Sequence, residues 1–136
     1  IALDGSRLTV TNASLVNVAG GSYLGVTGNL LSVANGSQLT VNGGLLLFAR
    51  AGSVVEISGA LLSFGGTGNT VTVSNALCPC TTIGGIPVRL SGGALAANVS
   101  ITNPIHNAAG NAVSIAAGAA AIRVDGTTTR LTISGQ

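Results

Sequence analysis

A short motif recurs along the first half of the chain, and this repeat limits the possible folds more than any other feature. Each copy begins with serine and continues with alternating aliphatic residues. Successive copies start 15 or 16 residues apart, at Ser6, Ser22, Ser37 and Ser53. A second, looser aliphatic unit lies in each interval. Equivalent units at a fixed spacing predict an architecture in which neighbouring copies pack on one another.

The residues inside each unit alternate as they do in a β-strand. Leu8 and Val10 stand two apart with Thr9 between them, and the unit that starts at Ser37 repeats this order. A two-residue period places the aliphatic side chains on one face and the polar ones on the other. Asn-Gly, Gly-Gly and Ser-Gly steps close the units and supply the positive φ angles that corners need.

Such short strands cannot bury enough apolar surface alone, so successive units must stack into a continuous core. We therefore predict an all-β fold, a parallel β-solenoid (β-helix) with Gly and Asn corners, in one domain over residues 1–136. The regular repeats cover about 5–75, and 76–136 continues them less regularly. The alternative is an antiparallel sandwich. The similar sequences of the units disfavour this fold, because β-hairpins do not require repeated units.

The number of strands in each coil is a separate question. A 16-residue period is typical of two strands per coil in a flattened tube, whereas the half-period of 7 to 9 residues suits a triangular coil of three units. Of the two, we favour the triangular or irregular coil.

The composition excludes several classes of protein. Only 6% of the residues are charged and the formal net charge is +2, so a clustered basic face for nucleic acid is not expected. Polar residues or glycine interrupt every apolar run, so no segment is long enough to predict a membrane span. Because 46% of the residues are hydrophobic, intrinsic disorder is also excluded.

Few residues in this chain could carry out chemistry. Asp4, Glu56 and Asp125 are its only acidic residues and lie far apart in the sequence, whereas glycoside cleavage needs a pair of carboxylates in one groove. His106 has no acidic neighbour and no second histidine for a metal site or a relay. We predict no enzymatic activity, no cofactor and no metal site.

Cys78-Pro-Cys80 is the most unusual local feature. The two thiols could form a disulfide within the chain, bridge to another chain, bind a soft metal or remain free. Two cysteines alone do not complete a tetrahedral metal site. A disulfide is therefore expected if the protein is extracellular.

The first ten residues resemble residues 122–133, because in both an alternating strand leads into Asp-Gly and then to Arg-Leu-Thr. Asp4 and Asp125 are expected to start turns and to bond to their own backbone. The match suggests one of two arrangements. Either the chain is one segment of a long array of such repeats, or its last coil serves as the template for the first coil of the next copy. Neither end shows a helical or charged cap, so we predict an end-to-end interface that contains Ile1, Leu3, Asp4, Ile122, Val124, Asp125, Leu131 and Ile133.

One leucine recurs at the start of each looser unit, at Leu15, Leu30, Leu45 and Leu61. These leucines either pack into corners or form an outward apolar stripe. An outward stripe would indicate lateral association with another copy or with a surface.

The unit Gly-Ser-x-Leu-Thr-Val, at residues 5–10 and 36–41, resembles the repeats of bacterial secreted β-helices, namely filamentous-haemagglutinin-like adhesins and autotransporter passenger domains. The resemblance covers about residues 5–75. It implies export, an extracellular or cell-surface location and a structural or adhesive role, with no catalytic residues.

These observations together predict a structural, non-catalytic subunit of a self-assembling extracellular filament or sheath, whose partners are copies of itself. A host or cell-surface polymer is a further candidate partner. The alternative is a fragment of a large surface adhesin or autotransporter passenger, and the start at Ile1 suits a processed form or a piece of a longer chain. An ice-binding solenoid is less expected, because the spacing of Thr9, Thr40 and Thr72 predicts that they do not recur in every coil.

Overall fold

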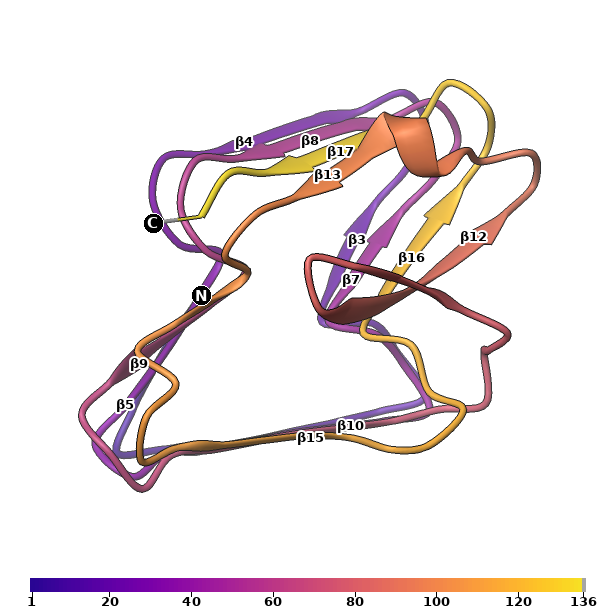
Figure 1. Ribbon diagram of the computed structural model, residues 1–136. Coiled ribbons are helices and arrows are strands. Elements are labelled where there is room, and N and C mark those ends of the chain that lie inside the picture. The colour runs from indigo at the N-terminus through magenta and orange to yellow at the C-terminus, as the bar shows by residue number, and fades with distance from the viewer. Residues whose placement is uncertain (136) are drawn as a thin grey trace.

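Seventeen strands and one short 3-10 helix form the regular structure of the computed structural model, which describes residues 1–135. The strands make four sheets, which are the four sides of a tube when viewed along its axis (Figure 1). Sheet A contains β1 (Ala2–Asp4), β5 (Leu31–Ala34), β9 (Leu62–Gly65) and β14 (Ile105–His106). Sheet B contains β2 (Arg7–Thr11), β6 (Gln38–Asn42), β10 (Thr70–Ser74) and β15 (Ala112–Ile115). Sheet C contains β3 (Val16–Val18), β7 (Leu47–Ala49), β16 (Ile122–Asp125), β12 (Ile86–Ser91) and β11 (Thr81–Ile83). Sheet D contains β4 (Tyr23–Val26), β8 (Val54–Ile57), β17 (Arg130–Ile133) and β13 (Val99–Ile101), which follows the helix η1 (Ala96–Asn98).

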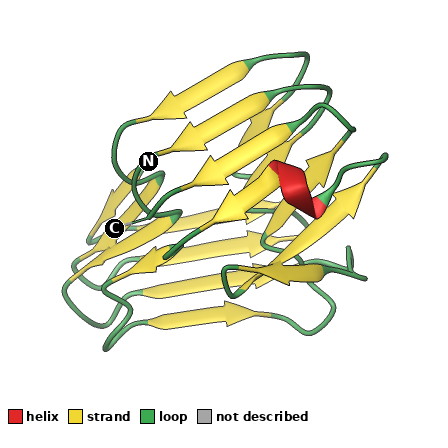
Figure 2. Ribbon diagram, turned by 45° about the horizontal axis from the view of Figure 1, so that its top comes forward, coloured by secondary structure: helices red, strands yellow, loops and turns green. Residues whose placement is uncertain are grey.

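Nearly all neighbouring strands run parallel, which confirms the β-solenoid and excludes the antiparallel sandwich. Figure 2 shows the strands stacked side by side in successive layers. Twelve of the thirteen strand pairings in residues 1–135 are parallel, and the exception is β11 with β12 at one edge of sheet C.

Each coil has four strands, so both the flattened and the triangular coil are wrong. Leu8 on β2 pairs with Leu39 on β6, and Leu39 and Val71 on β10 occupy the same column. The 15- or 16-residue repeat is therefore half a coil. One unit forms a strand of sheet B or D, and the looser unit forms a strand of sheet A or C.

The strands do not fill the layers in sequence order. The first layer contains β1 to β4 and the second contains β5 to β8. β9 and β10 form the third layer of sheets A and B. The chain then leaves the third-layer places in sheets C and D empty and forms the fourth layer with β12 to β15. It then returns, so that β16 lies between β7 and β12 and β17 lies between β8 and β13.

Aliphatic ladders fill the tube. The inward column of sheet B runs from Leu8 through Leu39 and Val71 to Val113. Leu39 and Val71 are only 1% exposed, whereas Leu8 and Val113 in the outermost layers are half-buried. The core is therefore complete in the middle layers and thinner at both ends.

The corners confirm the predicted role of glycine and asparagine. Asn35 and Gly36 turn the chain from sheet A to sheet B with φ angles of 55° and 71°. Positive φ is the region that glycine adopts freely and asparagine tolerates.

A ladder of polar side chains runs inside the corner between sheets A and B. The Ser6 N–H donates to Ser37 Oγ at 3.0 Å, the Ser37 N–H to Asn69 Oδ1 at 2.9 Å, and the Asn69 N–H to Asn111 Oδ1 at 3.0 Å. Ser37 and Asn69 are fully buried. Each layer thus satisfies a backbone donor of the layer before it, which a buried corner requires.

Candidate functional site

One end of the tube, the first-layer end, has no strand covering it. β1, β2, β3 and β4 are each outermost in their sheet, so one row of their backbone groups has no partner in the tube. Leu24 and Val26, which point inward from β4, are only half-buried, and Ile1 is 55% exposed. The N-terminal amino group donates to the Leu30 carbonyl at 2.8 Å and holds Ile1 against the second layer. Ile1, Leu3 and Asp4 of the predicted end-to-end interface lie at this end.

The opposite end, the fourth-layer end, is partly covered, unlike the capless end that the sequence predicts. β13, β14 and β15 are outermost in sheets D, A and B, but in sheet C the antiparallel strand β11 covers β12. A hollow of about 590 Å³ at this end is lined by residues that include Cys78, Cys80, Ile86, Ile105 and Val113. The irregular segment that carries the cysteines therefore overlies part of the apolar core.

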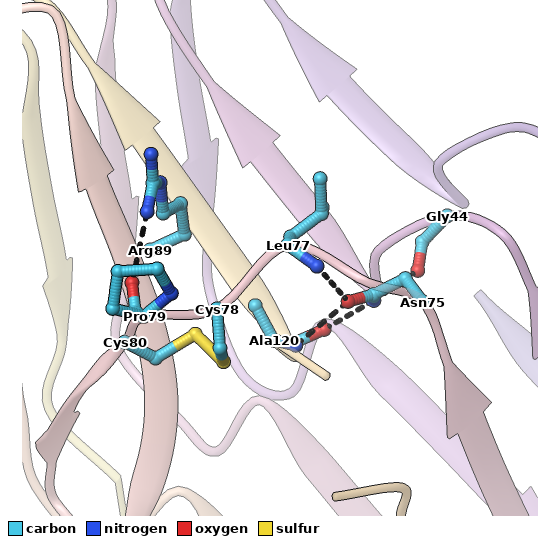
Figure 3. The surroundings of a disulfide bond; sticks show 8 residues. All are labelled: Gly44, Asn75, Leu77, Cys78, Pro79, Cys80, Arg89 and Ala120. Carbon is cyan, nitrogen blue, oxygen red and sulfur yellow. Dashed lines mark hydrogen bonds between the residues drawn. A yellow bond between two sulfur atoms is a disulfide. The ribbon is translucent and has the colours of Figure 1, made fainter. Parts of the chain in front are cut away.

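A disulfide joins Cys78 and Cys80, which lie 4.5 Å apart between their Cα atoms (Figure 3). Among the sequence alternatives, the disulfide within the chain is the one that forms, so neither sulfur is free for a metal or for another chain. The Cys78 N–H donates to the Gly118 carbonyl at 3.0 Å, and Arg89 Nη1 donates to the Pro79 carbonyl at 3.0 Å. These bonds fix the segment to the tube.

Asn75 anchors the same segment where the chain departs from sheet B. Its Nδ2 donates to the carbonyls of Gly44 and Ala120 at 2.8 and 2.7 Å, and its Oδ1 accepts from the Ala120 N–H at 2.8 Å (Figure 3). One side chain therefore joins the second layer to the segment that leads back into the third layer.

The predicted end-to-end interface is wrong in its second half. Ile122, Val124, Leu131 and Ile133 are fully buried in β16 and β17, which have a neighbouring strand on both sides. They do not lie on an edge strand, because the last strands return to the third layer. The likeness between the two ends of the sequence has a different cause: β1 and β2 flank the corner between sheets A and B, whereas β16 and β17 flank the equivalent corner between C and D.

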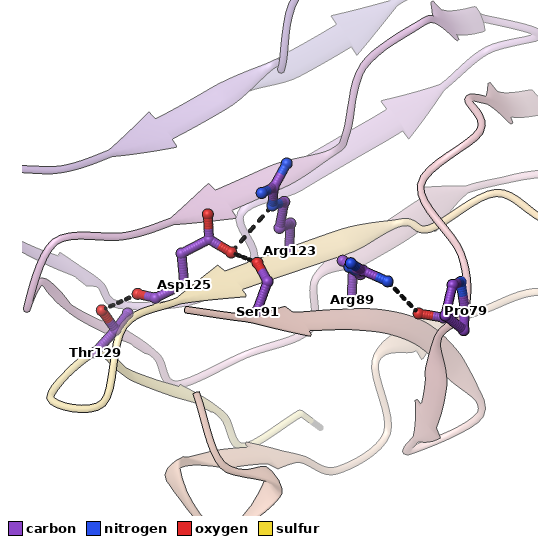
Figure 4. A network of polar contacts seen from close by, with 6 residues as sticks. All are labelled: Pro79, Arg89, Ser91, Arg123, Asp125 and Thr129. Atoms are coloured by element: carbon purple, nitrogen blue, oxygen red, sulfur yellow. Dashed lines mark hydrogen bonds and ion pairs between the residues drawn. The ribbon is translucent and has the colours of Figure 1, made fainter. Parts of the chain in front are cut away.

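Asp4 and Asp125 bond to neighbouring layers instead of to their own backbone. Asn35 Nδ2 donates to Asp4 Oδ1 from the second layer. Asp125 Oδ1 accepts from Ser91 Oγ on β12 and from Arg123 Nε at 3.0 Å (Figure 4). Both carboxylates thus cross-link strands.

The recurring leucines pack into corners, so the outward stripe is wrong. Leu30, Leu45 and Leu61 are 5%, 3% and 1% exposed, and Leu15 in the first layer is half-buried. Leu15 stacks with Leu45 between sheets B and C, and the other two leucines belong to the corner between D and A. They do not form one continuous row.

The acidic residues do not converge. Asp4 lies on sheet A, Glu56 on sheet D and Asp125 on sheet C. Half-buried His106 lies on β14 and pairs with Ser63. Within residues 1–135, no three histidine, cysteine or acidic side chains come together as a metal ion would require.

The outer face of sheet B carries a continuous row of hydroxyl groups, contrary to the prediction from the sequence. Thr9, Thr40 and Thr72 stack in one column, and Ser114 continues it in the fourth layer. The expectation that these threonines skip coils is wrong because one coil contains two of the sequence units.

The outer face of sheet D holds a group of side chains that sequence reasoning missed. Tyr23 is 66% exposed, and its hydroxyl donates to Glu56 Oε2 at 2.8 Å. Glu56 Oε1 lies 3.7 Å from Arg130 Nη2. The sequence contains one indication of this group: Tyr23 is the only tyrosine of the chain and occupies an outward position of its strand.

Glu56 also alters the acidity of the phenol. Its hydrogen bond and then its negative charge raise the pKa of Tyr23 above the ordinary value of 10.0. The hydroxyl is therefore protonated at neutral pH and remains a donor.

Comparisons with protein-family models, curated proteins and solved structures find no match to this chain. Among residues 1–135 there is also no helix with the length and apolar character of a membrane span.

Proposed function

We propose that this protein is a structural, non-catalytic subunit of a self-assembling extracellular filament, in which tubes stack head to tail. The first-layer end supports this proposal, since four strand edges and half-buried aliphatic side chains face outward there without a partner. Uncovered strand edges template pairing with another chain. A contact between two different ends does not close on itself and so propagates.

The ladders of the tube would continue across such a joint. In sheet B, Leu8 of one copy would follow Val113 of the copy before it, as Leu39 follows Leu8 inside the tube. In sheet D, Leu24 would follow Val99 and Val26 would follow Ile101 in the same way. Sheet C differs because β11 already lies where β3 of the next copy would pair, so a joint through sheets A, B and D requires the β11 segment to move aside.

Strand direction favours a head-to-tail joint over a head-to-head one. All pairings in sheets A, B and D are parallel, and head-to-tail stacking preserves that direction. Two first-layer ends brought face to face would instead place the first-layer strands of one copy against antiparallel strands of the other. The Cys78–Cys80 disulfide supports the extracellular part of the proposal, since disulfides persist in oxidising environments.

Thr9→Pro is expected to block assembly while leaving the tube folded. The Gln38 N–H donates to the Ser6 carbonyl and the Asn12 N–H donates to the Asn42 carbonyl. Because the backbone groups of successive residues alternate in direction, the Thr9 N–H points away from the second layer. Proline there removes a donor that only another copy would use, and edge strands tolerate it. We expect the concentration at which assembly begins, measured by light scattering, to rise about tenfold or more.

Thr9→Ala is the matched control, because it retains the N–H and is expected to assemble like the original protein. Circular dichroism should show that both variants are folded. The proposal is contradicted if the original protein stays monomeric at high concentration, or if Thr9→Pro assembles as readily as Thr9→Ala.

Ice binding is a second candidate function, which the threonine column of sheet B specifically favours. Thr9, Thr40, Thr72 and Ser114 form a regular hydroxyl row on a parallel sheet, and such a row can order water at the layer spacing of about 4.8 Å. If the row binds ice, the protein should inhibit ice recrystallisation, and Thr40→Lys should abolish this inhibition whereas Arg130→Ala on sheet D should not. No inhibition by the original protein would exclude this candidate.

A further inference from the structure

The outer face of sheet D contains a shallow trough that begins on β4 at the first-layer end and runs toward the third layer. The trough has a volume of about 540 Å³ and crosses three layers, from Tyr23 and Thr27 through Glu56 and Ser58 to Thr132. Three layers span about 10 Å along the tube axis. We propose that this trough binds a neutral pyranose unit of a polysaccharide, with Tyr23 as the stacking platform.

The tyrosine ring is positioned for stacking. Position 25, next to it on the outward face, is glycine, and a Cβ there would lie 2.8 Å from Cε1 of Tyr23 and 2.9 Å from its hydroxyl oxygen. The ring therefore extends over bare backbone, and the bond to Glu56 fixes its far end. An exposed aromatic ring that is already ordered offers apolar contact area at a low entropic cost. The C–H face of a pyranose ring is a suitable partner for such a surface.

Hydrogen-bonding groups lie in and beside the trough that contains the ring. Glu56 and Arg130 have side chains that are 46% and 60% exposed, so both retain capacity for further hydrogen bonds. Ser58 Oγ accepts from the Gly28 N–H at 2.9 Å, which leaves its O–H free to donate. Thr27 and Ser134 add two more hydroxyl groups. This mixture of donors and acceptors matches the vicinal hydroxyl groups of a sugar.

The charge balance indicates a neutral ligand. Glu56 and Arg130 form an ion pair at 3.7 Å, and the raised pKa of Tyr23 keeps its hydroxyl uncharged at neutral pH. Within residues 1–135, Glu56 is the one charged residue that lines the trough, and Arg130 beside it balances its charge. An anion would meet the carboxylate of Glu56 and a cation would have to displace Arg130 from it, whereas an uncharged polyhydroxyl compound meets neither obstacle.

The shape indicates a polymer rather than a small enclosed ligand. Small-molecule sites usually bury most of the ligand surface, but this trough is broadly exposed along one side of the tube. A chain lying along the tube axis would cross the strands of successive layers and extend beyond the trough toward β13 in the fourth layer.

Calorimetric titration with three neutral tetrasaccharides, namely cellotetraose, mannotetraose and maltotetraose, tests the proposal on the full chain. We expect at least one of them to bind with a dissociation constant on the order of 0.1 to 1 mM. Tyr23→Ala should weaken that binding at least about tenfold, while Tyr23→Phe should stay within about threefold because it keeps the ring. Since the chain has one tyrosine and no tryptophan, the intrinsic emission of the original protein should also change on binding.

Gly25→Ala provides a second variant that keeps every interacting group. Its new Cβ would displace the ring of Tyr23, so we expect binding to weaken although the tyrosine remains. Thr72→Ala, on the outer face of sheet B, is the control that should bind normally. Both Tyr23 and Gly25 are exposed, so circular dichroism should show unchanged folding.

Three results would overturn the proposal: no binding of any of the three sugars at about 10 mM, unchanged affinity in both Tyr23→Ala and Gly25→Ala, or tighter binding of the anionic tetragalacturonate than of every neutral sugar.

Discussion

Replacing Leu131 by alanine is expected to lower the free energy of unfolding by about 3 to 4 kcal/mol. Leu131 is fully buried in the third layer, where its strand pairs with β8 on one side and β13 on the other, next to Val55 and Val99. Removal of its side chain would leave a cavity that layers on both sides hold open. Urea unfolding followed by circular dichroism, at a concentration where the protein is monomeric, measures the loss.

Leu8→Ala is the matched control, since it removes the same atoms from the first layer. Leu8 is only half-buried and its strand has a neighbour on one side alone. We expect it to cost about half as much as Leu131→Ala or less. Equal losses for the two variants would contradict the position of β17 inside the stack.

Asn69→Ala is expected to destabilise the tube by about 2 to 3 kcal/mol. The Asn69 side chain is fully buried, and its Oδ1 accepts from the Ser37 N–H at 2.9 Å while its Nδ2 donates to the Gly65 carbonyl at 3.2 Å and to Asn111 Oδ1 at 2.8 Å. Alanine would leave the buried Ser37 donor without a partner, and an unsatisfied buried group carries its full desolvation cost.

Asn17→Ala, on the exposed outer face of sheet C, is the comparison for this variant and should change stability by less than about 0.5 kcal/mol. Thermal and urea unfolding of both variants measure the difference. A loss at Asn69 no larger than the loss at Asn17 would show that the polar ladder of the corner does not stabilise the tube.

The kind of fold was predictable from the sequence because its cause is local. The alternation of Leu8, Thr9 and Val10 specifies a strand with one inward face, and steps such as Asn35-Gly36 specify corners. The structure has both features at these positions. Repetition of the unit then requires stacking, whatever the shape of the coil.

The number of sides and the order of the layers were not predictable in this way. The bend at each corner decides whether two, three or four strands close a coil, and the repeat length alone does not specify that bend. The return of β16 and β17 to the third layer depends on contacts between residues far apart in the sequence. Ile122 and Leu131 would suit the inward face of any layer, so their pattern does not identify the third.

The candidate sites were predictable only in part. The Cys78–Cys80 disulfide was one of several alternatives that the spacing allowed, and the fold selected it. The trough on sheet D was missed because Tyr23, Glu56 and Arg130 come from three layers and only the register of the coils brings them together. For the same reason, the threonine column of sheet B could be recognised only once the length of a coil was known.

Electron microscopy of the concentrated protein, with image averaging along the axis of any fibre, tests most directly whether copies continue one another's coils. Four layers at about 4.8 Å predict unbranched fibres in which one copy adds about 19 Å to the length, with all copies pointing the same way. Isolated single tubes, or pairs related by a two-fold axis through their first-layer ends, would contradict the account.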